Sequence, residues 1–406
     1  MRTAIVVGAG IGGVTAAVAL EQCGWQVTVL ERAQELGEVG AGISVWPSAV
    51  AVLEELGVVG VEKAAAAGGA AGMRKPNGRW VVEAADLGVE IPVMIHRAQL
   101  HELITDRFGP AVTVRTGIAV TGLTQHPDGV TITAAGQSIA TTNIPHGVPA
   151  GSVEEFQADL VIGADGIRSV TRAALYPEHP GPQYAGYTAY RGIADVDLSD
   201  GGGETWGRGH RFGFAELIDG RIYWYATANR EPGPPPGPDG IHADVVRQFG
   251  DWHEPIPSLL AGTPAETVLQ NDIHDLPVPL APFVNGRVVL LGDAAHAMTP
   301  NLGRGACSAI EDAGALARHL RGTPAPGGAD PRSTPDLTTA LGRYDAERRP
   351  ATAKLIKRSR AVGKLGQLDN GLVCAVRDGL FAVGGKVAAL MAGLRARRRG
   401  VEQSRV

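Results

Sequence analysis

The sequence predicts an α/β protein: a Rossmann-like unit, an antiparallel sheet inserted into it, and a C-terminal helical segment. The chain opens as strand, helix and strand at Thr3–Val7, Val14–Gln22 and Gln26–Leu30, the pattern of parallel strands joined by a right-handed crossover. Between Tyr184 and Asn229, aromatic and β-branched residues alternate between turn signals, which is typical of an antiparallel sheet. Helical sequence then runs intermittently from Leu337 to Arg399.

Further elements are expected on either side of the inserted sheet. Pro47–Leu56 is predicted to be a helix that ends at Gly57, and Leu160–Gly163 is a short apolar run typical of a strand covered on both faces. The remaining predictions are helices at Arg97–Phe108 and Ala306–Leu320, strands at Val112–Arg115, Val130–Ala134 and Val288–Leu291, and Pro/Gly-rich loops at Pro232–Gly240 and Gly322–Pro335.

Composition excludes several classes of protein. The chain has 406 residues, which at roughly 150 residues per domain suggests two or three domains. Hydrophobic residues make up 44% and charged residues 19%, so the chain can bury a large core. Lys and Arg total 37 against 42 for Asp and Glu, and this net charge of −5 argues against nucleic-acid binding.

Cysteine usage and hydropathy favour a cytoplasmic protein. The three cysteines are odd in number, far apart and without CxxC spacing, so neither a disulfide framework nor a metal site is expected. The short apolar N-terminal run ends in glycines and does not match a signal peptide. No uncharged apolar run is long enough for a transmembrane helix, so no integral membrane segment is expected.

The first motif is a glycine-rich GxGxxG turn. Gly8, Gly10, Gly12 and Gly13 lie where the first strand meets the first helix. Glycines there allow a tight turn, close approach of a pyrophosphate, and close packing of helix on strand. Glu31 ends the next strand, where a carboxylate can accept hydrogen bonds from a ribose diol. The motif therefore predicts a dinucleotide site.

Two further motifs each follow a buried strand. Asp165 and Gly166 follow Leu160–Gly163, and by themselves they also fit an ordinary strand and turn. Asp293 follows the strand near residue 290, where it is placed to hold a ligand hydroxyl. The loop Pro300–Gly305 then leads into a helix whose first N–H groups suit an electron-rich oxygen, although a helix entry without a ligand would look similar.

Together the three motifs resemble those of one family over nearly the whole chain. In order and spacing they are similar to the single-component FAD-dependent aromatic hydroxylases, the class A flavoprotein monooxygenases of the p-hydroxybenzoate hydroxylase type. The middle of the chain most resembles the salicylate, 3-hydroxybenzoate, urate and zeaxanthin oxygenase branch. The resemblance implies an FAD-binding domain formed by residues 1–70, 95–180 and 276–335, a substrate domain formed by 71–94 and 181–275, and C-terminal helices over 336–406.

The resemblance also implies which residues bind FAD. The ADP half is expected on the GxGxxG turn, with Glu31, Arg32 and Val120 nearby. Asp165 would bear on FAD and the nicotinamide cofactor, and Asp293 on the ribityl and pyrophosphate region. The flavin ring is expected against Gly42, Pro300, Gly303, Gly305 and Ala306, and Arg97 is expected to start the helix that faces FAD. No metal is implied, and His296 is expected to make a structural hydrogen bond rather than to act in catalysis.

The implied reaction is insertion of one oxygen atom. In this family NAD(P)H reduces FAD, O2 forms a flavin C4a-hydroperoxide, and its distal oxygen transfers to an aromatic or otherwise electron-rich small molecule. Only one GxGxxG is present, so NAD(P)H is expected to dock transiently. Alternatives are an epoxidase or a Baeyer–Villiger oxygenase and, further away, a flavin halogenase or a non-enzymatic flavin-binding module. A monomer or a homodimer is expected, and Arg395 and Arg397–Arg399 are expected to form a solvated helix end.

Arg211 and Tyr223 match the substrate arginine and tyrosine of the family's urate hydroxylases. With Pro300 they are the catalytic candidates: the arginine could pair with an anionic substrate, and the tyrosine could orient or deprotonate a phenol. Both could equally be packing residues. A two-residue loop at Asp219-Gly220 would put the pair on opposite faces of their hairpin, whereas a three-residue loop from Ile218 would put them on one face. A shared site requires the three-residue loop, and we predict that register.

Overall fold

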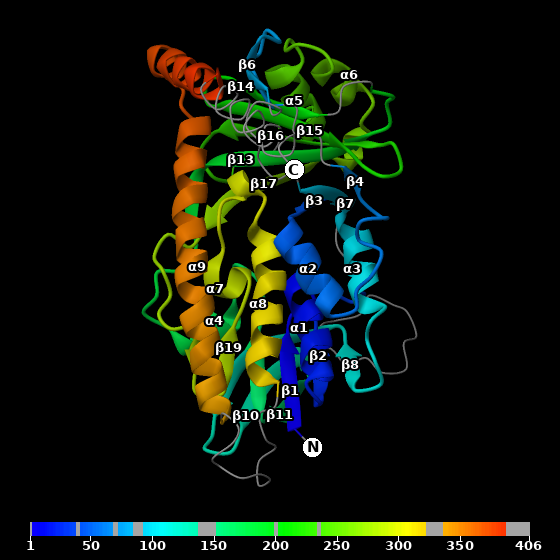
Figure 1. The fold of residues 1–406 in the computed structure, drawn as a ribbon, viewed down its shortest axis with the longest axis vertical. Coiled ribbons are helices and arrows are strands. Elements are labelled where there is room, and N and C mark those ends of the chain that lie inside the picture. Colours follow the sequence, from blue (N-terminus) through cyan, green and yellow to red (C-terminus); the bar gives the residue numbers. More distant parts are fainter. Residues whose placement is uncertain are drawn as a thin grey trace, which may run out of the picture.

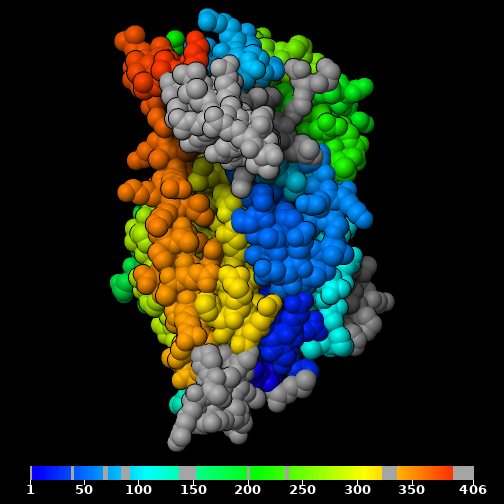
Figure 2. Space-filling view, in the orientation of Figure 1, coloured from blue at the N-terminus to red at the C-terminus, as the bar shows by residue number. Residues whose placement is uncertain are grey.

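The computed structural model describes residues 2–37, 41–67, 72–83, 92–136, 152–198, 202–233, 237–321 and 336–386. An α/β unit with the N-terminus at its far end occupies one half of the molecule, and a mainly antiparallel sheet occupies the other (Figure 1). One long helix, α9 (Leu337–Gly366), runs along the side of the α/β unit toward the antiparallel sheet. The space-filling view shows α9 lying beside α8 (Gly305–Leu320) on one face (Figure 2).

The α/β unit is built on a six-stranded sheet of order β18-β19-β12-β1-β2-β8. Its strands are β1 (Arg2–Val7), β2 (Trp25–Leu30), β8 (Val112–Arg115), β12 (Leu160–Gly163), β19 (Val288–Leu290) and β18 (Val284–Asn285). All neighbours pair in parallel except β18, which pairs antiparallel at the edge. Every expected strand of this sheet is present, and β12 is buried at all four positions, as its continuous apolar run predicts.

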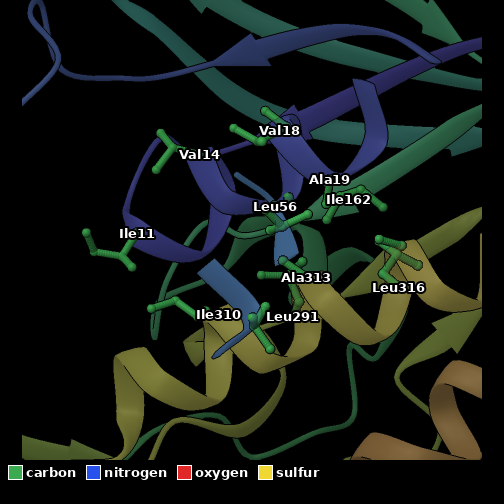
Figure 3. Close-up of a cluster of buried hydrophobic side chains, with 14 of the residues drawn as sticks. Ile11, Val14, Val18, Ala19, Leu56, Ile162, Leu291, Ile310, Ala313 and Leu316 are labelled. Carbon is green, nitrogen blue, oxygen red and sulfur yellow. The ribbon is translucent and has the colours of Figure 1, made fainter. Parts of the chain in front are cut away.

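Helices cover both the sheet and one another. These helices are α1 (Ile11–Gln22), α2 (Pro47–Glu55), α3 (Arg97–Thr105) and α8. Ile11, Val14 and Val18 of α1 lie in one apolar cluster with Ile310 and Leu316 of α8 (Figure 3). The helices can approach closely because Gly12 carries no side chain: a Cβ atom there would lie 2.9 Å from the Cβ of Ala309.

Two small sheets border this unit. One consists of β9 (Ile118–Gln125), β10 (Val130–Gly136) and β11 (Val153–Ala158), and the other of β3 (Gly42–Val45), β4 (Ala66–Ala67) and β7 (Val93–His96). Of these strands, only β10 was expected from the sequence. Short connecting helices complete the unit: α4 (Val170–Leu175), α7 (Asp293–His296) and the 3₁₀ turn η3 (Pro300–Leu302).

The other half is a seven-stranded sheet of order β17-β13-β16-β15-β14-β5-β6, in which all neighbours pair antiparallel except β14 and β5, which are parallel. Its strands are β17 (Leu269–Asp275), β13 (Gln183–Ala194), β16 (Ile222–Asn229), β15 (His210–Glu216), β14 (Gly203–Trp206), β5 (Gly72–Arg74) and β6 (Trp80–Glu83). One face packs on α5 (Gly240–Phe249) and α6 (Ile256–Ala261), with the 3₁₀ turn η2 (Ala265–Thr267) following. Phe212 stacks on Trp224 in that core, which leaves the opposite face for the α/β unit.

The hairpin between β15 and β16 has the three-residue loop. The N–H of Leu217 donates to the carbonyl of Arg221 at 2.8 Å, and Gly220 has a φ of +83°. Ala215 lies opposite Tyr223 and Arg211 opposite Thr227. Arg211 and Tyr223 therefore share one face of the sheet, and the predicted register is confirmed.

After α9, a second helical segment covers residues 371–386. The expected loop Gly322–Pro335 and the arginines Arg395 and Arg397–Arg399 lie outside the described residues. Within the described part of the chain, none of the helices is long and apolar enough to cross a bilayer.

Candidate active site

The parallel register brings the three motifs to one edge of the six-stranded sheet. Val7 pairs with both Leu30 and Gly163, and Gly163 pairs with Leu290. The residues that follow these strands are the GxGxxG turn, Glu31, Asp165 and Asp293. Their side chains and turns therefore gather where ligands bind open α/β sheets, at the carboxyl ends of the strands.

The turn between β1 and α1 has the features of an anion site. Gly8 has a φ of +97°, and a Cβ atom there would lie 2.6 Å from the carbonyl oxygen of Ala164, so the turn requires glycine. Gly10 caps α1, and the first turn, which contains Gly12 and Gly13, has neither a side-chain cap nor an acidic residue. Its N–H groups are therefore available to a phosphate, whose charge the helix dipole favours.

The carboxylate of Glu31 is fixed beside this turn. Oε2 accepts a hydrogen bond from the N–H of Ala9 at 2.7 Å, and Oε1 accepts one from the N–H of Ala33 at 2.8 Å. Each oxygen has a second acceptor site, which suits the hydroxyls of a ribose. Buried His101 on α3 lies 2.7 Å through Nε2 from the carbonyl oxygen of Ala9 and steadies the same turn. Sequence reasoning missed His101, although a histidine among apolar helix positions was a signal.

The other predicted nucleotide residues lie around this edge. Arg32 follows Glu31 and is exposed. Val120 lies on β9, whose first residue, Ile118, donates its N–H to the carbonyl of Glu31 at 2.9 Å. Arg97 begins α3, and its N–H donates to the carbonyl of Ala41 at 2.9 Å. Arg32 and Val120 thus lie on the β2 side of the turn, where the family resemblance implies the adenine end of FAD.

Asp165 orders the turn that follows β12. Its carboxylate accepts hydrogen bonds from the hydroxyl of Ser169 at 2.5 Å and from the N–H of Thr171 at 2.9 Å. Buried Arg172 then links two motifs, because it donates to the carbonyls of Ile167 at 2.6 Å and Ala294 at 3.0 Å. Sequence reasoning missed Arg172, which lies too far along the chain from Asp293 for the contact to be foreseen.

Asp293 begins α7, three residues after β19, and it is exposed. Desolvation by the surrounding protein raises the pKa of Asp293, while His296, Arg97 and Arg172 act in the opposite direction. An accessible carboxyl at this edge can exchange hydrogen bonds with a ligand hydroxyl.

The loop before α8 presents a second helix N-terminus. Pro300–Leu302 form η3, Gly303 follows in the left-handed region, and α8 begins at Gly305 without a side-chain cap. Space is open in front of Gly305, since a Cβ atom there would meet nothing within 4 Å. The N–H groups of Gly305 and Ala306 are therefore placed to donate to an electron-rich oxygen of a ring. The thiol of Cys307, on the next residue, is buried, and desolvation raises its pKa to about 11.

Arg211 and Tyr223 lie at two ends of one sheet face. They are separated by four positions in the ladder, which corresponds to about 13 Å along the strands. Tyr223 lies at the β3 end, where its ring packs against Gly42 and Met94. Burial raises the pKa of Tyr223, although Arg191 and Arg97 oppose the shift. Tyr223 therefore stays protonated at neutral pH and can orient a phenol by hydrogen bonding, but it cannot deprotonate one.

Arg211 is buried and already paired. Its Nη2 lies 2.8 and 2.9 Å from the two carboxylate oxygens of Glu204 on β14, and its guanidinium lies 4.8 Å from the ring centroid of Trp206. The phenol of Tyr225, on the strand that carries Tyr223, donates to the same carboxylate. Sequence reasoning missed Glu204 and Tyr225. Tyr225 had a signal, because it lies two residues after Tyr223 and hence on the same face.

Asn301 connects this face to the loop before α8. Its Oδ1 accepts a hydrogen bond from Nη1 of Arg211 at 2.6 Å, and its Nδ2 donates to Tyr187 at 3.0 Å and to the carbonyl of Ser359 on α9 at 3.1 Å. Arg211 also lies against Gly366 of α9, where a Cβ atom would be 2.7 Å from its Cδ. The loop, the sheet face and α9 thus meet at one polar junction.

A pocket of about 730 Å³ adjoins this junction from the side of α9. Its lining includes Tyr187 and Asn229 from the sheet, Thr299 from the loop, and Arg360 and Lys364 from α9. Thr299 directly precedes Pro300. By the ladder register, Tyr187 and Asn229 lie on the same sheet face as Arg211 and Tyr223, so the pocket reaches the loop along that face, at the end away from Tyr223.

His296 takes part in a buried charge network. Its Nε2 lies 2.5 Å from Asp312 on α8, and Arg348 on α9 donates through Nε to the same carboxylate at 2.6 Å. Asp312 also accepts the N–H of Gly292 at 2.9 Å. These contacts tie α7, α8 and α9 together, so the hydrogen bond of His296 has the structural geometry that the sequence suggested. Among the described residues, no group of three His, Cys, Asp or Glu residues could hold a metal ion.

Comparisons with known proteins agree with this geometry. The family model described as "FAD binding domain" matches residues 1–204 and 275–359. The chain is 38% identical over 391 residues to the aurachin C monooxygenase/isomerase of Stigmatella aurantiaca, covering 93% of each chain. It is 33% identical to the FAD-dependent urate hydroxylase of Klebsiella pneumoniae, covering 88% of each.

Solved structures share the whole architecture. Klebsiella pneumoniae HpxO complexed with FAD and uric acid matches with a TM-score of 0.79 and 29% identity, over 96% of this chain and 95% of that one. A salicylate hydroxylase substrate complex matches with a TM-score of 0.69 at 23% identity, over 96% and 98%, and supports the fold alone. The two halves of the molecule and the long helix beside them therefore have counterparts in solved structures. From its family match and these relatives, the chain belongs to the FAD binding domain family and, within it, to the FAD-dependent monooxygenases.

Proposed function

We propose that this monooxygenase hydroxylates an aromatic or otherwise electron-rich small molecule between the loop before α8 and the sheet face that carries Arg211 and Tyr223. The hydrogen bond from Arg211 to Asn301, at 2.6 Å, carries this proposal. Asn301 belongs to the loop expected to lie against the flavin ring, so the bond holds that loop directly beside the polar sheet face. A substrate on this face would lie within reach of the reacting ring.

The residues at the strand ends fit FAD. The uncapped start of α1 suits the pyrophosphate, Glu31 has acceptor sites for the ribose, and Asp293 offers an accessible carboxyl that suits the ribityl hydroxyls. The open space before Gly305 suits the edge of the ring. When bound, FAD accepts a hydride from NAD(P)H and activates O2 for transfer of one oxygen atom.

The protein's own residues then position the substrate and exclude water. Protonated Tyr223 donates a hydrogen bond that orients a phenol or carbonyl group. Pro300 and its neighbours in η3 cover the reacting edge, and Asn301 fixes their distance from Arg211. A dry pocket of fixed width favours oxygen transfer over unproductive release of peroxide.

We further propose the domain limits that the sequence suggested: FAD binding by 1–70, 95–180 and 276–335, substrate binding by 71–94 and 181–275, and a helical C-terminal part over 336–406. That β5 and β6 join the seven-stranded sheet supports assigning 71–94 to the substrate part. We propose a cytoplasmic monomer or homodimer. The three free cysteines, Cys23, Cys307 and Cys374, support a reducing compartment.

Substrate-stimulated oxidation of NAD(P)H by the FAD-loaded protein tests the function. A panel of phenols, anilines and nitrogen heterocycles is offered under ¹⁸O₂, and products are analysed by mass spectrometry. The proposal requires at least one compound that accelerates NAD(P)H oxidation and gains one ¹⁸O atom on a ring carbon. A product that has gained oxygen as an epoxide or a ring ester would instead identify the alternative oxygenases. Failure of the protein to bind FAD would overturn the assignment altogether.

A further inference from the structure

We propose that Glu204 sets the substrate class of this site by neutralising Arg211, so that the Arg211 end of the sheet face takes an uncharged hydrogen-bonding group and not a carboxylate or enolate. The inference rests on the proposed function and deepens it. It also replaces the expectation that Arg211 itself attracts an anionic substrate, because the guanidinium already has a carboxylate partner.

The contacts show that the pair is built into the sheet. Glu204 lies opposite Gly213, and its carboxylate accepts hydrogen bonds from Arg211, from Tyr225 and from the indole N–H of Trp206. Gly213 permits the contact with Tyr225: a Cβ atom there would lie 2.4 Å from the Cζ of Tyr225, whose ring crosses β15 to reach β14. The Arg211 side chain is 3% exposed and that of Glu204 31% exposed, so the carboxylate is the more accessible member of the pair.

The remaining partners of Arg211 carry no charge. Asn301 offers an amide oxygen, and Trp206 offers the face of its ring. Arg377 also lies over the Trp206 ring, and it shares the carboxylate of Asp378 with Lys75. In direct contact with Arg211, within the described part of the chain, the balance is therefore one cation against one carboxylate.

This balance discriminates between ligands of different charge. An anion that approached Arg211 would meet the carboxylate of Glu204 or would have to displace it, and both outcomes leave like charges close together in a desolvated site. A neutral carbonyl, amide or hydroxyl can exchange hydrogen bonds with Tyr225 and Glu204 without that penalty. At the other end of the sheet face, Arg191 donates a hydrogen bond to Asn271. Because Arg191 is present in every variant described below, it does not change the comparison between them.

Removing the charge of Glu204 should therefore create an anion site. The FAD-loaded enzyme is titrated with salicylate and with salicylamide, which differ in charge but little in shape, and binding is followed through the absorbance of the flavin. In Glu204→Gln we expect the Kd for salicylate to fall at least about tenfold, whereas the Kd for salicylamide changes less than about threefold. In the double variant Glu204→Gln with Arg211→Gln, the gain for salicylate should disappear.

The proposal is overturned if Glu204→Gln retains FAD and binds salicylate no better than the wild type does. It is also overturned if the double variant, which lacks Arg211, keeps the higher affinity for salicylate. If Glu204→Gln does not fold, the wild type alone decides. Because Glu204 neutralises Arg211, the wild type should bind salicylamide at least about threefold more tightly than salicylate; a wild type that prefers salicylate contradicts the proposal. Loss of FAD binding by the wild type would instead count against the proposed function.

Discussion

Tyr223 illustrates how the surroundings of one residue restrict its chemistry. A tyrosine matched to a substrate position could orient a phenol or remove its proton, and the sequence leaves both roles open. The packing of its ring against Gly42 and Met94 decides between them, because burial raises the pKa of the phenol. The group stays protonated through the neutral range and acts as a donor.

We therefore expect Tyr223→Phe to retain FAD and to lower kcat/KM about 2- to 12-fold, the range for loss of one neutral hydrogen bond. The pH dependence of kcat/KM between pH 6 and 9 should keep its shape, because Tyr223 does not ionise there. Steady-state assays with the best substrate across this range test both points. An ionisation that disappears in Tyr223→Phe would show that the residue acts as a base.

Glu31 carries a second prediction for a single residue. Replacing Glu31 with alanine removes the two carboxylate oxygens that the N–H groups of Ala9 and Ala33 hold in place for the ribose. We expect this change to weaken FAD binding by about 1–3 kcal/mol. Fluorescence titration of the apoprotein with FAD measures the change. Glu35→Ala is the matched control, because Glu35 is exposed on the same loop and should leave the affinity unchanged. Equal affinities for both variants would mean that the ribose lies elsewhere.

At the scale of the elements, the ionised carboxylate of Asp312 joins α7, α8 and α9. Desolvation by itself would raise the pKa of Asp312, but His296 and Arg348 outweigh it, and the pKa is lowered. A lowered pKa means that ionised Asp312 stabilises the folded protein above the ordinary aspartate range, and that this stabilisation is lost as the pH falls through the native pKa.

Asp312→Asn should accordingly lower the free energy of unfolding at pH 7 by about 3–5 kcal/mol, because it breaks the buried ion pair with Arg348 and leaves that guanidinium with the more distant carboxylate of Glu311, at 3.1 Å. The difference from the wild type should shrink as the pH falls below about 4, where the unfolded wild-type chain takes up the proton, and it should be lost once the pH passes the lowered native pKa. Urea unfolding at several pH values measures this. Asp251→Asn, at an exposed position, serves as the control. A loss of stability that does not depend on pH would mean that packing, and not charge, is responsible.

The sequence indicated some elements and not others for physical reasons. The strands of the six-stranded sheet are short apolar runs covered on both faces, and such runs are recognisable locally. Strand β3 was missed because its partner, β7, lies far along the chain. Strands β9 and β11 were missed because most of their residues are half-buried or exposed. The hairpin register could be reasoned out because its loop is local. The contact between Glu204 and Arg211 could not, since it depends on how β14 pairs with β15.

At the scale of the whole molecule, FAD should be bound without a covalent link. The one thiol beside the expected ring position, Cys307, is buried and has a pKa of about 11, so it provides no thiolate at neutral pH. We expect a yellow protein whose flavin passes a filtration membrane after acid precipitation. Flavin that stays with the precipitated chain would contradict this expectation.

Reduction of the bound flavin should depend on the substrate. The chain has a single GxGxxG, so a transient nicotinamide encounter is expected to become productive when the substrate pocket is filled. Anaerobic stopped-flow mixing with NADH or NADPH should show faster loss of flavin absorbance with substrate than without. Equal rates would indicate a standing nicotinamide site that we have not located.

The position of α9 has a further consequence for how this protein could change its range of substrates. Two of the residues through which the helix meets the site have no side chain: a Cβ atom at Gly363 would lie 2.4 Å from Nδ2 of Asn301, and one at Gly366 would lie 2.7 Å from Cδ of Arg211. A single methyl group on either would push the loop or the arginine inward without touching the nucleotide edge. Pocket width and cofactor binding can therefore vary independently, and adaptation to a smaller molecule is available through one substitution on a helix outside both sheets.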